Sequence, residues 1–147
     1  MKLFRVLCLV VSGALVGAVL VYAILLRPAF ARGRQVRTCA DMNTVATYLA
    51  AYRGANQAYP RRLAEAVPVS AAKLFRDGFG YLLHYESAEE GYVLVSFGRD
   101  GRPDTTDYWA LRSALAVSAH TNPASVAGQP DADQVLTDLG WVRSGCK

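Results

Sequence analysis

The chain has 147 residues, of which 52% are hydrophobic, and its formal net charge is +4. This length allows one ordinary domain beside a membrane segment, because single domains commonly run to about 100 to 150 residues. The positive charge does not indicate nucleic-acid binding, because no basic run interleaved with aromatic residues follows the amino-terminal segment.

The amino-terminal segment Val6–Leu26 contains 21 residues without a charge, enough for a helix to cross the hydrocarbon layer of a membrane. It is either a retained anchor or a cleaved signal, since a basic start precedes it and the small-x-small triplet Ala29–Ala31 follows it. The apolar run is longer than that of a typical signal peptide, which favours the anchor. We therefore predict a cytoplasmic amino terminus and membrane anchor over residues 1–31, and a periplasmic domain over residues 32–147, in a bacterial inner membrane.

Two features of the sequence disagree about the orientation of this anchor. More arginines follow the span than there are basic residues before it, and the positive-inside rule would then keep the domain in the cytoplasm. The rule weakens where a sizeable domain follows the span, and a pair of cysteines beyond the span is typical of an oxidising compartment. We expect the domain in the periplasm, with the anchor crossing the membrane once.

Beyond the span, Pro28 and Gly33 are expected to interrupt the helix. A new helix is predicted over Thr38–Arg53, because apolar residues recur there at steps of three and four. This stripe is expected to face the core and consists of Cys39, Met42, Val45, Ala46, Leu49 and Tyr52. Gly54 is expected to stop the helix, and Leu63–Val67 is expected to form one further helical turn.

The second half of the chain predicts strands. Tyr81–Tyr85 and Tyr92–Phe97 have the composition and alternation of an antiparallel pair, and Gln134–Thr137 with Trp141–Ser144 predicts a second hairpin. The segment Trp109–Ala119 fits a helix and a strand equally well. Together these elements predict an α+β fold in which a helix packs on a small antiparallel sheet.

An acidic loop follows the second of these strands. Gly98 and Gly101 permit sharp turns, and Asp100, Asp104 and Asp107 lie close together in the sequence. Several oxygens converging from a short loop suit a hard cation such as calcium. The alternative is a solvated turn whose aspartates bond backbone amides.

The cysteines allow one disulfide in the domain. Cys8 lies within the span, which leaves Cys39 and Cys146 as the internal pair. A bond between them would close nearly the whole domain and stabilise it by about 4 to 5 kcal/mol in the chain-entropy model. The alternative is two unpaired thiols, with Cys39 acting as a small core hydrophobe.

Three short blocks between about Thr44 and Trp109 occur in a defined order and spacing. In chain order they are Tyr52 with Asn56 and Tyr59-Pro60; Leu74 with Asp77-Gly78-Phe79-Gly80 and Tyr85; and Ser96-Phe97-Gly98-Arg99-Asp100-Gly101. Together they resemble the carboxyl-terminal domain of the major pseudopilin of type II secretion systems. That family has Pro and Trp where this chain has Gly78 and Phe79.

The resemblance implies a calcium ion in the loop after the last strand of the sheet. By position, Asp100 matches the first carboxylate ligand, Asp107 the first of a later pair, and Phe97 a residue that supplies its carbonyl oxygen. The second of the later pair falls on Tyr108, so Asp104 would have to take its place. The family's prepilin leader and the glutamate of its membrane helix are not matched, which indicates a pseudopilin-type domain on an uncleaved anchor.

The sequence predicts no catalytic site. His84 and His120 have no cysteine or carboxylate at metal-ligand spacing, and no phosphate loop or nucleophile motif occurs. We predict a non-catalytic component of a type II secretion or type IV pilus-like apparatus. Its expected partners are the inner membrane and other pseudopilins or secretion-system subunits, without nucleic acid. The alternative is a stand-alone periplasmic binding or envelope module unrelated to secretion.

Overall fold

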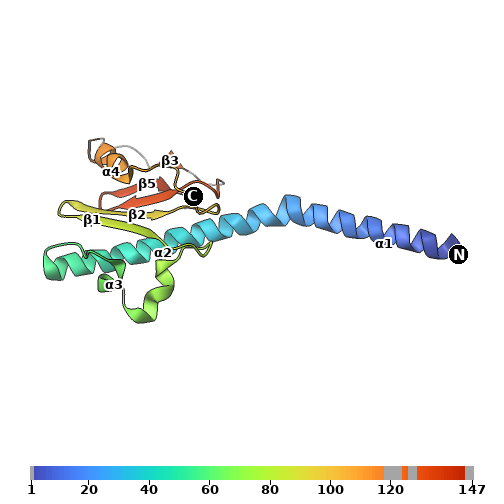
Figure 1. Ribbon diagram of the computed structural model, residues 1–147, viewed down its shortest axis with the longest axis horizontal. Coiled ribbons are helices and arrows are strands. Elements are labelled where there is room, and N and C mark those ends of the chain that lie inside the picture. The colour runs from blue at the N-terminus through green and yellow to red at the C-terminus, as the bar shows by residue number, and fades with distance from the viewer. Residues whose placement is uncertain (1, 118–123, 126–128, 145–147) are drawn as a thin grey trace. The chain divides into compact units, whose positions relative to one another are not determined.

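The computed structural model describes residues 2–117, 124–125 and 129–144. The chain divides into two compact units between Gly33 and Arg34. The first unit is helical, and the second combines helices with a five-stranded sheet (Figure 1). The predicted α+β class is therefore confirmed at the level of its secondary structure.

The amino-terminal helix has three parts: α1 (Lys2–Val21), a π-helical turn η1 (Tyr22–Leu26) and α2 (Arg27–Asn56). The helical stretch Gly13–Asn56 contains a window of mean hydropathy 2.0 of which 6% is buried, so it is long and apolar enough to cross a membrane. A membrane anchor and a signal sequence near the amino terminus share this property.

The predicted interruption at Pro28 and Gly33 is wrong, because α2 runs through both residues. The N–H of Arg27 donates to the carbonyl of Tyr22, five residues earlier, which is the wide hydrogen-bond pattern of a π turn. Pro28 then lies in the first turn of α2, where its missing N–H and fixed φ are tolerated. Gly33 weakens a helix by about 1 kcal/mol relative to alanine, which is too little to end it.

The buried stripe of α2 packs on one face of the sheet. Met42, Val45 and Leu49 are fully buried and share a hydrophobic cluster with Leu94 and Leu136 of the sheet. These positions confirm the predicted stripe. Its three- and four-residue steps put the side chains on one side of the helix, where burial stabilises each by about 1.5 to 3 kcal/mol.

The end of α2 lies beyond Gly54, so this glycine is not the cap that was predicted. Gln57 takes the left-handed conformation with φ of 63°, and its N–H donates to the carbonyl of Arg53. The chain then forms the short helix α3 (Leu63–Ala66), where one helical turn was expected, and the 3₁₀ helix η2 (Val69–Phe75).

The sheet has five strands in the order β1-β2-β4-β5-β3. Neighbouring strands are antiparallel, except that β3 runs parallel to β5. The strands are β1 (His84–Ala88), β2 (Gly91–Ser96), β3 (Ala124–Ser125), β4 (Gln134–Thr137) and β5 (Gly140–Ser144). Both predicted hairpins are present.

The first strand begins at His84, three residues later than predicted. The reason is Asp77, whose Oδ1 accepts hydrogen bonds from the backbone N–H groups of Phe79 and Tyr81, both at 2.9 Å. This turn directs residues 77–81 away from the ladder, and only an isolated bridge between Arg76 and Leu82 precedes β1.

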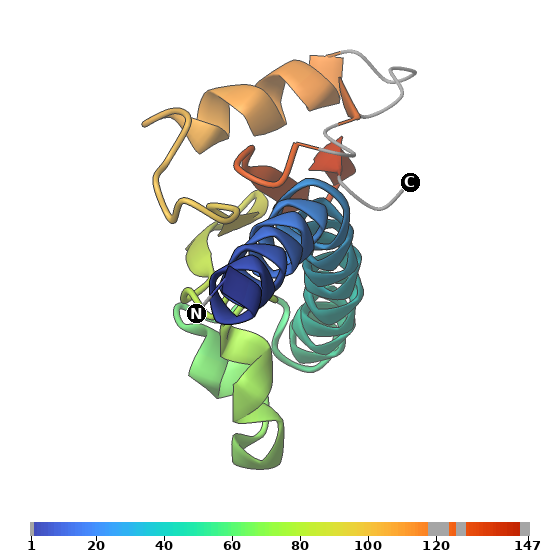
Figure 2. The same cartoon turned by 90° about the vertical axis from the view of Figure 1, so that its right-hand side faces the viewer.

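The other face of the sheet is covered by α4 (Tyr108–Val117), so the ambiguous segment is helical as far as Val117, and residues 118–119 lie outside the described residues. Figures 1 and 2 show α4 on one side of the sheet and α2 on the other. Val93, Val95 and Val135 form a second cluster with Tyr108 of α4. Because helices cover both faces, β2 is buried along its whole length.

Candidate functional site

The acidic loop of residues 97–107 connects β2 to α4 and packs against two other segments of the chain. Gly98 and Gly101 have φ of 67° and 65°, which residues with side chains rarely adopt. A side chain at Gly98 would overlap the backbone of Pro130, and one at Gly101 would overlap the ring of Tyr81. Both glycines are therefore required by conformation and by close packing.

Asp100 and Asp107 are exposed and bond only nearby backbone groups. Asp100 Oδ1 accepts from the N–H of Arg102 at 3.1 Å, and Asp107 Oδ1 accepts from the N–H of Ala110 at 2.8 Å. Asp107 thereby caps the amino end of α4, where a carboxylate also interacts favourably with the helix dipole.

Asp104 has partners on the sheet. Its Oδ2 accepts from Arg143 Nη1 at 3.0 Å and from the backbone N–H of Asp133 at 3.0 Å. In return the N–H of Asp104 donates to Asp133 Oδ2 at 2.7 Å. This reciprocal pair fastens the loop to the start of β4.

The sequence analysis missed Asp133, which is fully buried. Its Oδ2 also accepts a hydrogen bond from the hydroxyl of Tyr108 at 2.5 Å, and its Oδ1 has no hydrogen-bond partner among the described residues. Burial raises the pKa of Asp133 above its ordinary value. Burial and the neighbouring Asp133 also raise the pKa of Tyr108. The only sequence signal was an Asp-x-Asp before a predicted strand.

The residues of this loop fit a calcium ion incompletely. Among the residues that the structure describes, no three histidine, cysteine or acidic side chains form a group that could hold a metal. Tyr108, which stands where the family that the sequence resembles has its second aspartate, donates to the carboxylate of Asp133. Arg143 is paired with Oδ2 of Asp104, so a calcium ion using Asp104 would share this carboxylate with a guanidinium group. The calcium site stays a prediction.

Cys39 is buried on α2, with its Sγ 3.1 Å from Oε1 of Gln134 on β4. Its predicted partner Cys146 lies outside the described residues. Cys39 is disulfide-bonded, and the identity of its partner stays a prediction.

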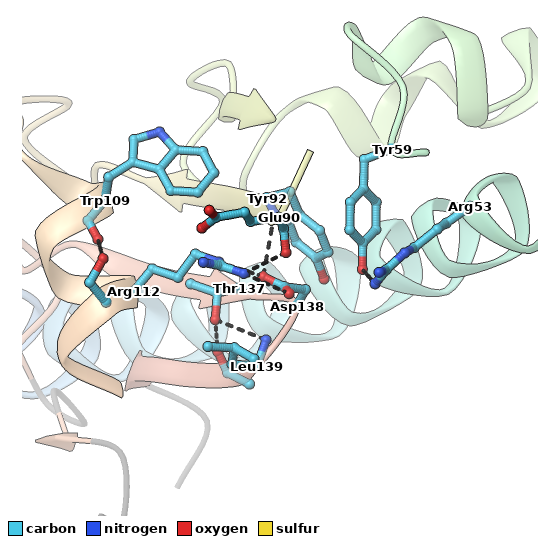
Figure 3. Close-up of polar contacts among 11 residues, drawn as sticks. Arg53, Tyr59, Glu90, Tyr92, Trp109, Arg112, Thr137, Asp138 and Leu139 are labelled. Carbon is cyan, nitrogen blue, oxygen red and sulfur yellow. Dashed lines mark hydrogen bonds and ion pairs between the residues drawn. The ribbon is translucent and has the colours of Figure 1, made fainter. Parts of the chain in front are cut away.

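A buried ion pair joins α4 to both hairpin turns (Figure 3). Arg112 Nε and Nη2 donate to the two carboxylate oxygens of Asp138 at 2.7 and 3.0 Å, and Nη2 also donates to the carbonyl of Glu90 at 2.7 Å. The two side chains are 9% and 8% exposed. A Cβ at Gly91 would overlap the ends of both side chains, so a larger residue there would have to displace the ion pair. The hydrogen bonds to Asp138 raise the pKa of Arg112.

The three blocks of the resemblance are bonded to each other. The hydroxyl of Ser96 donates to Asp77 Oδ2 at 2.7 Å, which joins the second block to the third. The hydroxyl of Tyr85 donates to the carbonyl of Pro60 at 2.9 Å, which joins the first block to the second. These contacts tie the loop after α2 to β1, and the loop before β1 to the end of β2.

The departure at Gly78 has a local cause. Its N–H donates to Thr38 Oγ1 at 2.8 Å, and a side chain there would overlap the carbonyl of Arg34. Proline, the residue of the resembled family at this position, would lack the donor and would overlap the carbonyl of Arg34.

No family model matches the sequence, and no curated protein or solved structure matches it.

Proposed function

We propose that this chain is a non-catalytic component of a type II secretion or type IV pilus-like apparatus. It would carry a pseudopilin-type domain in the periplasm on an uncleaved anchor in the bacterial inner membrane. The observation that carries the proposal is the bonding between the three sequence blocks. The residues that carry the resemblance join the loop after α2 to β1, through Pro60 with Tyr85, and the loop before β1 to the end of β2, through Asp77 with Ser96.

The contacts of the polar residues favour an architectural role over a catalytic one. The hydroxyl of Ser96 is bonded to Asp77, and the ring of His84 is bonded to Glu86 Oε1 at 2.8 Å. A serine nucleophile needs a base within hydrogen-bond reach, and these two side chains have other partners.

We include in this proposal a calcium ion bound by Asp100 and Asp107, with the carbonyl of Phe97 and with Asp104 as the third carboxylate. The ion would relieve the repulsion between neighbouring carboxylates and hold the loop rigid. Its affinity would be weak to moderate, because Arg143 already neutralises the charge of Asp104.

The test is a deletion of the gene in its own organism, followed by photo-crosslinking from the restored protein. Val36 on α2 is 51% exposed and is a suitable site for a photoreactive residue, with Leu139 in the β4–β5 turn, 47% exposed, as the matched control site. We expect loss of protein export or of pili on deletion. We also expect adducts from Val36 to pseudopilins or other subunits of the apparatus.

Normal export and piliation in the deletion strain, together with adducts only to proteins outside such an apparatus, would contradict the proposal. That outcome would favour the alternative of a stand-alone periplasmic binding or envelope module.

A further inference from the structure

A shallow apolar hollow opens beside the first strand of the sheet. Its volume is about 310 Å³, and its walls come from the loop after α2, from α3, from η2 and from the start of β1. The lining residues that matter here are Arg61, Arg62, Leu63, Phe75, Leu82 and Tyr85. Figure 1 shows α3 on the α2 side of the sheet.

The rim of this hollow presents a leucine to solvent. Leu82 is 60% exposed, although its backbone is fixed by the bridge to Arg76 and the N–H of the next residue, Leu83, donates to Phe75. An exposed leucine on a fixed backbone next to an apolar hollow is a ready contact for another apolar side chain.

The segment that frames the hollow is strongly cationic. Residues 61–76 contain four basic residues and one acidic residue, a net charge of +3 in a chain whose total is +4. The basic residues are all exposed: Arg61, Arg62, Lys73 and Arg76. Arg62 Nε donates to Glu65 Oε1 at 3.1 Å. The side chain of Arg61 has no hydrogen bond or ion pair among the described residues. The surroundings of the hollow therefore favour an acidic partner.

The hollow lies at an open edge of the sheet. Strand β1 lies at one end of the sheet order and pairs with β2 alone among the described strands. Tyr85 of β1 lines the hollow. An extended chain that pairs with this edge would run past the hollow and could place one side chain in it.

We propose that this hollow and the free edge of β1 bind an extended acidic segment of a partner protein, with an apolar side chain in the hollow and neighbouring carboxylates against Arg61 and Arg62. The positive charge of residues 61–76 favours a partner segment with acidic side chains, and the apolar lining favours an apolar side chain in the hollow. This inference does not depend on the secretion role proposed above.

A membrane surface is the other occupant that a cationic apolar patch suits, but the shape favours a peptide. Binding to lipid relies on apolar side chains that protrude from the surface, as Leu82 does, whereas the concave apolar lining beside Leu82 accepts a side chain from outside.

The experiment uses the full chain in nanodiscs of zwitterionic lipid and three fluorescein-labelled heptapeptides, measured by fluorescence anisotropy. One peptide alternates leucine with glutamate, the second leucine with lysine, and the third serine with glutamate. The variants are Leu82→Ser and Arg61→Glu, and the matched controls are Leu139→Ser and Arg102→Glu, at exposed positions away from the hollow.

We expect saturable binding of the leucine-glutamate peptide alone, with a Kd below about 1 mM that rises with salt. Leu82→Ser should raise this Kd by about tenfold and Arg61→Glu by about fivefold, while both controls leave it unchanged. Binding that is absent, or equal in the variants and controls, would overturn the proposal. Co-flotation with phosphatidylglycerol vesicles that Arg61→Glu abolishes, without peptide binding, would assign the surface to lipid instead.

Discussion

Replacing Asp138 with alanine should destabilise the domain by about 3 to 5 kcal/mol, because it leaves the charge of Arg112 buried without its partner. The guanidinium side chain is 9% exposed, so water cannot replace the two lost hydrogen bonds without opening the packing of α4 on the sheet. The carbonyl of Glu90 would remain as an acceptor, but it carries no compensating charge.

The assay is thermal unfolding of the full chain in detergent, followed by near-ultraviolet circular dichroism of the two tryptophans, Trp109 and Trp141. For a domain of this size about 1 kcal/mol corresponds to about 4 °C, so Tm should fall by about 12 to 20 °C. The double variant Asp138→Ala with Arg112→Leu should recover most of this loss, because it removes the unpaired charge as well.

A matched control comes from an exposed ion pair of similar geometry. Arg99 Nε and Nη2 each lie 2.7 Å from a carboxylate oxygen of Asp131, but these side chains are 49% and 51% exposed. Asp131→Ala should therefore cost less than about 1 kcal/mol. If Asp138→Ala lowers the free energy of unfolding no more than Asp131→Ala does, burial does not strengthen the Arg112–Asp138 pair. That result would refute the prediction.

Three further measurements address the loop and the cysteines, and a fourth addresses topology. Millimolar calcium should raise Tm relative to EDTA, and Asp100→Ala should abolish this shift whereas Asp77→Ala should leave it; equal melting in EDTA and calcium would mean that the loop is only a turn. Non-reducing mass spectrometry should find Cys39 joined to Cys146, and alkylation of both thiols without denaturant would contradict the pairing. Burial raises the pKa of Asp133 in the folded state, so its ionisation as the pH rises opposes folding. Asp133→Asn should therefore raise Tm near pH 7 by an amount that shrinks as the pH falls toward 4, and a constant difference across this range would disprove the assignment. Alkaline phosphatase fused to the carboxyl end should be active in the membrane fraction, whereas activity of a cytoplasmic reporter alone would reverse the proposed orientation.

The elements with one strong periodicity were predictable from the sequence. The stripe Met42, Val45 and Leu49 is buried as expected, because three- and four-residue steps allow only one buried face on a helix. The hairpin Gln134–Thr137 with Gly140–Ser144 followed equally well from its turn residues.

The errors arose where a distant contact or an unusual hydrogen-bond pattern overrode a local rule. Pro28 does not end the helix, because it lies in the first turn of α2, directly after the π turn η1. Tyr81 is not in β1, because Asp77 captures its N–H in a turn. The periodicity of the sequence does not indicate either hydrogen bond.

The sequence by itself determined the apolar span, the core face of α2, the hairpins and the position of the acidic loop, since each depends on residues close together in the chain. Only the tertiary structure decided the partners of the charged residues. Asp104 meets Asp133 across 29 positions, and Arg112 meets Asp138 across 26. From the sequence alone, a carboxylate is equally suited to bind a metal ion, to cap the amino end of a helix or to pair with a guanidinium group. The choice among them depends on which charge the fold brings within hydrogen-bond distance and how completely it excludes water there.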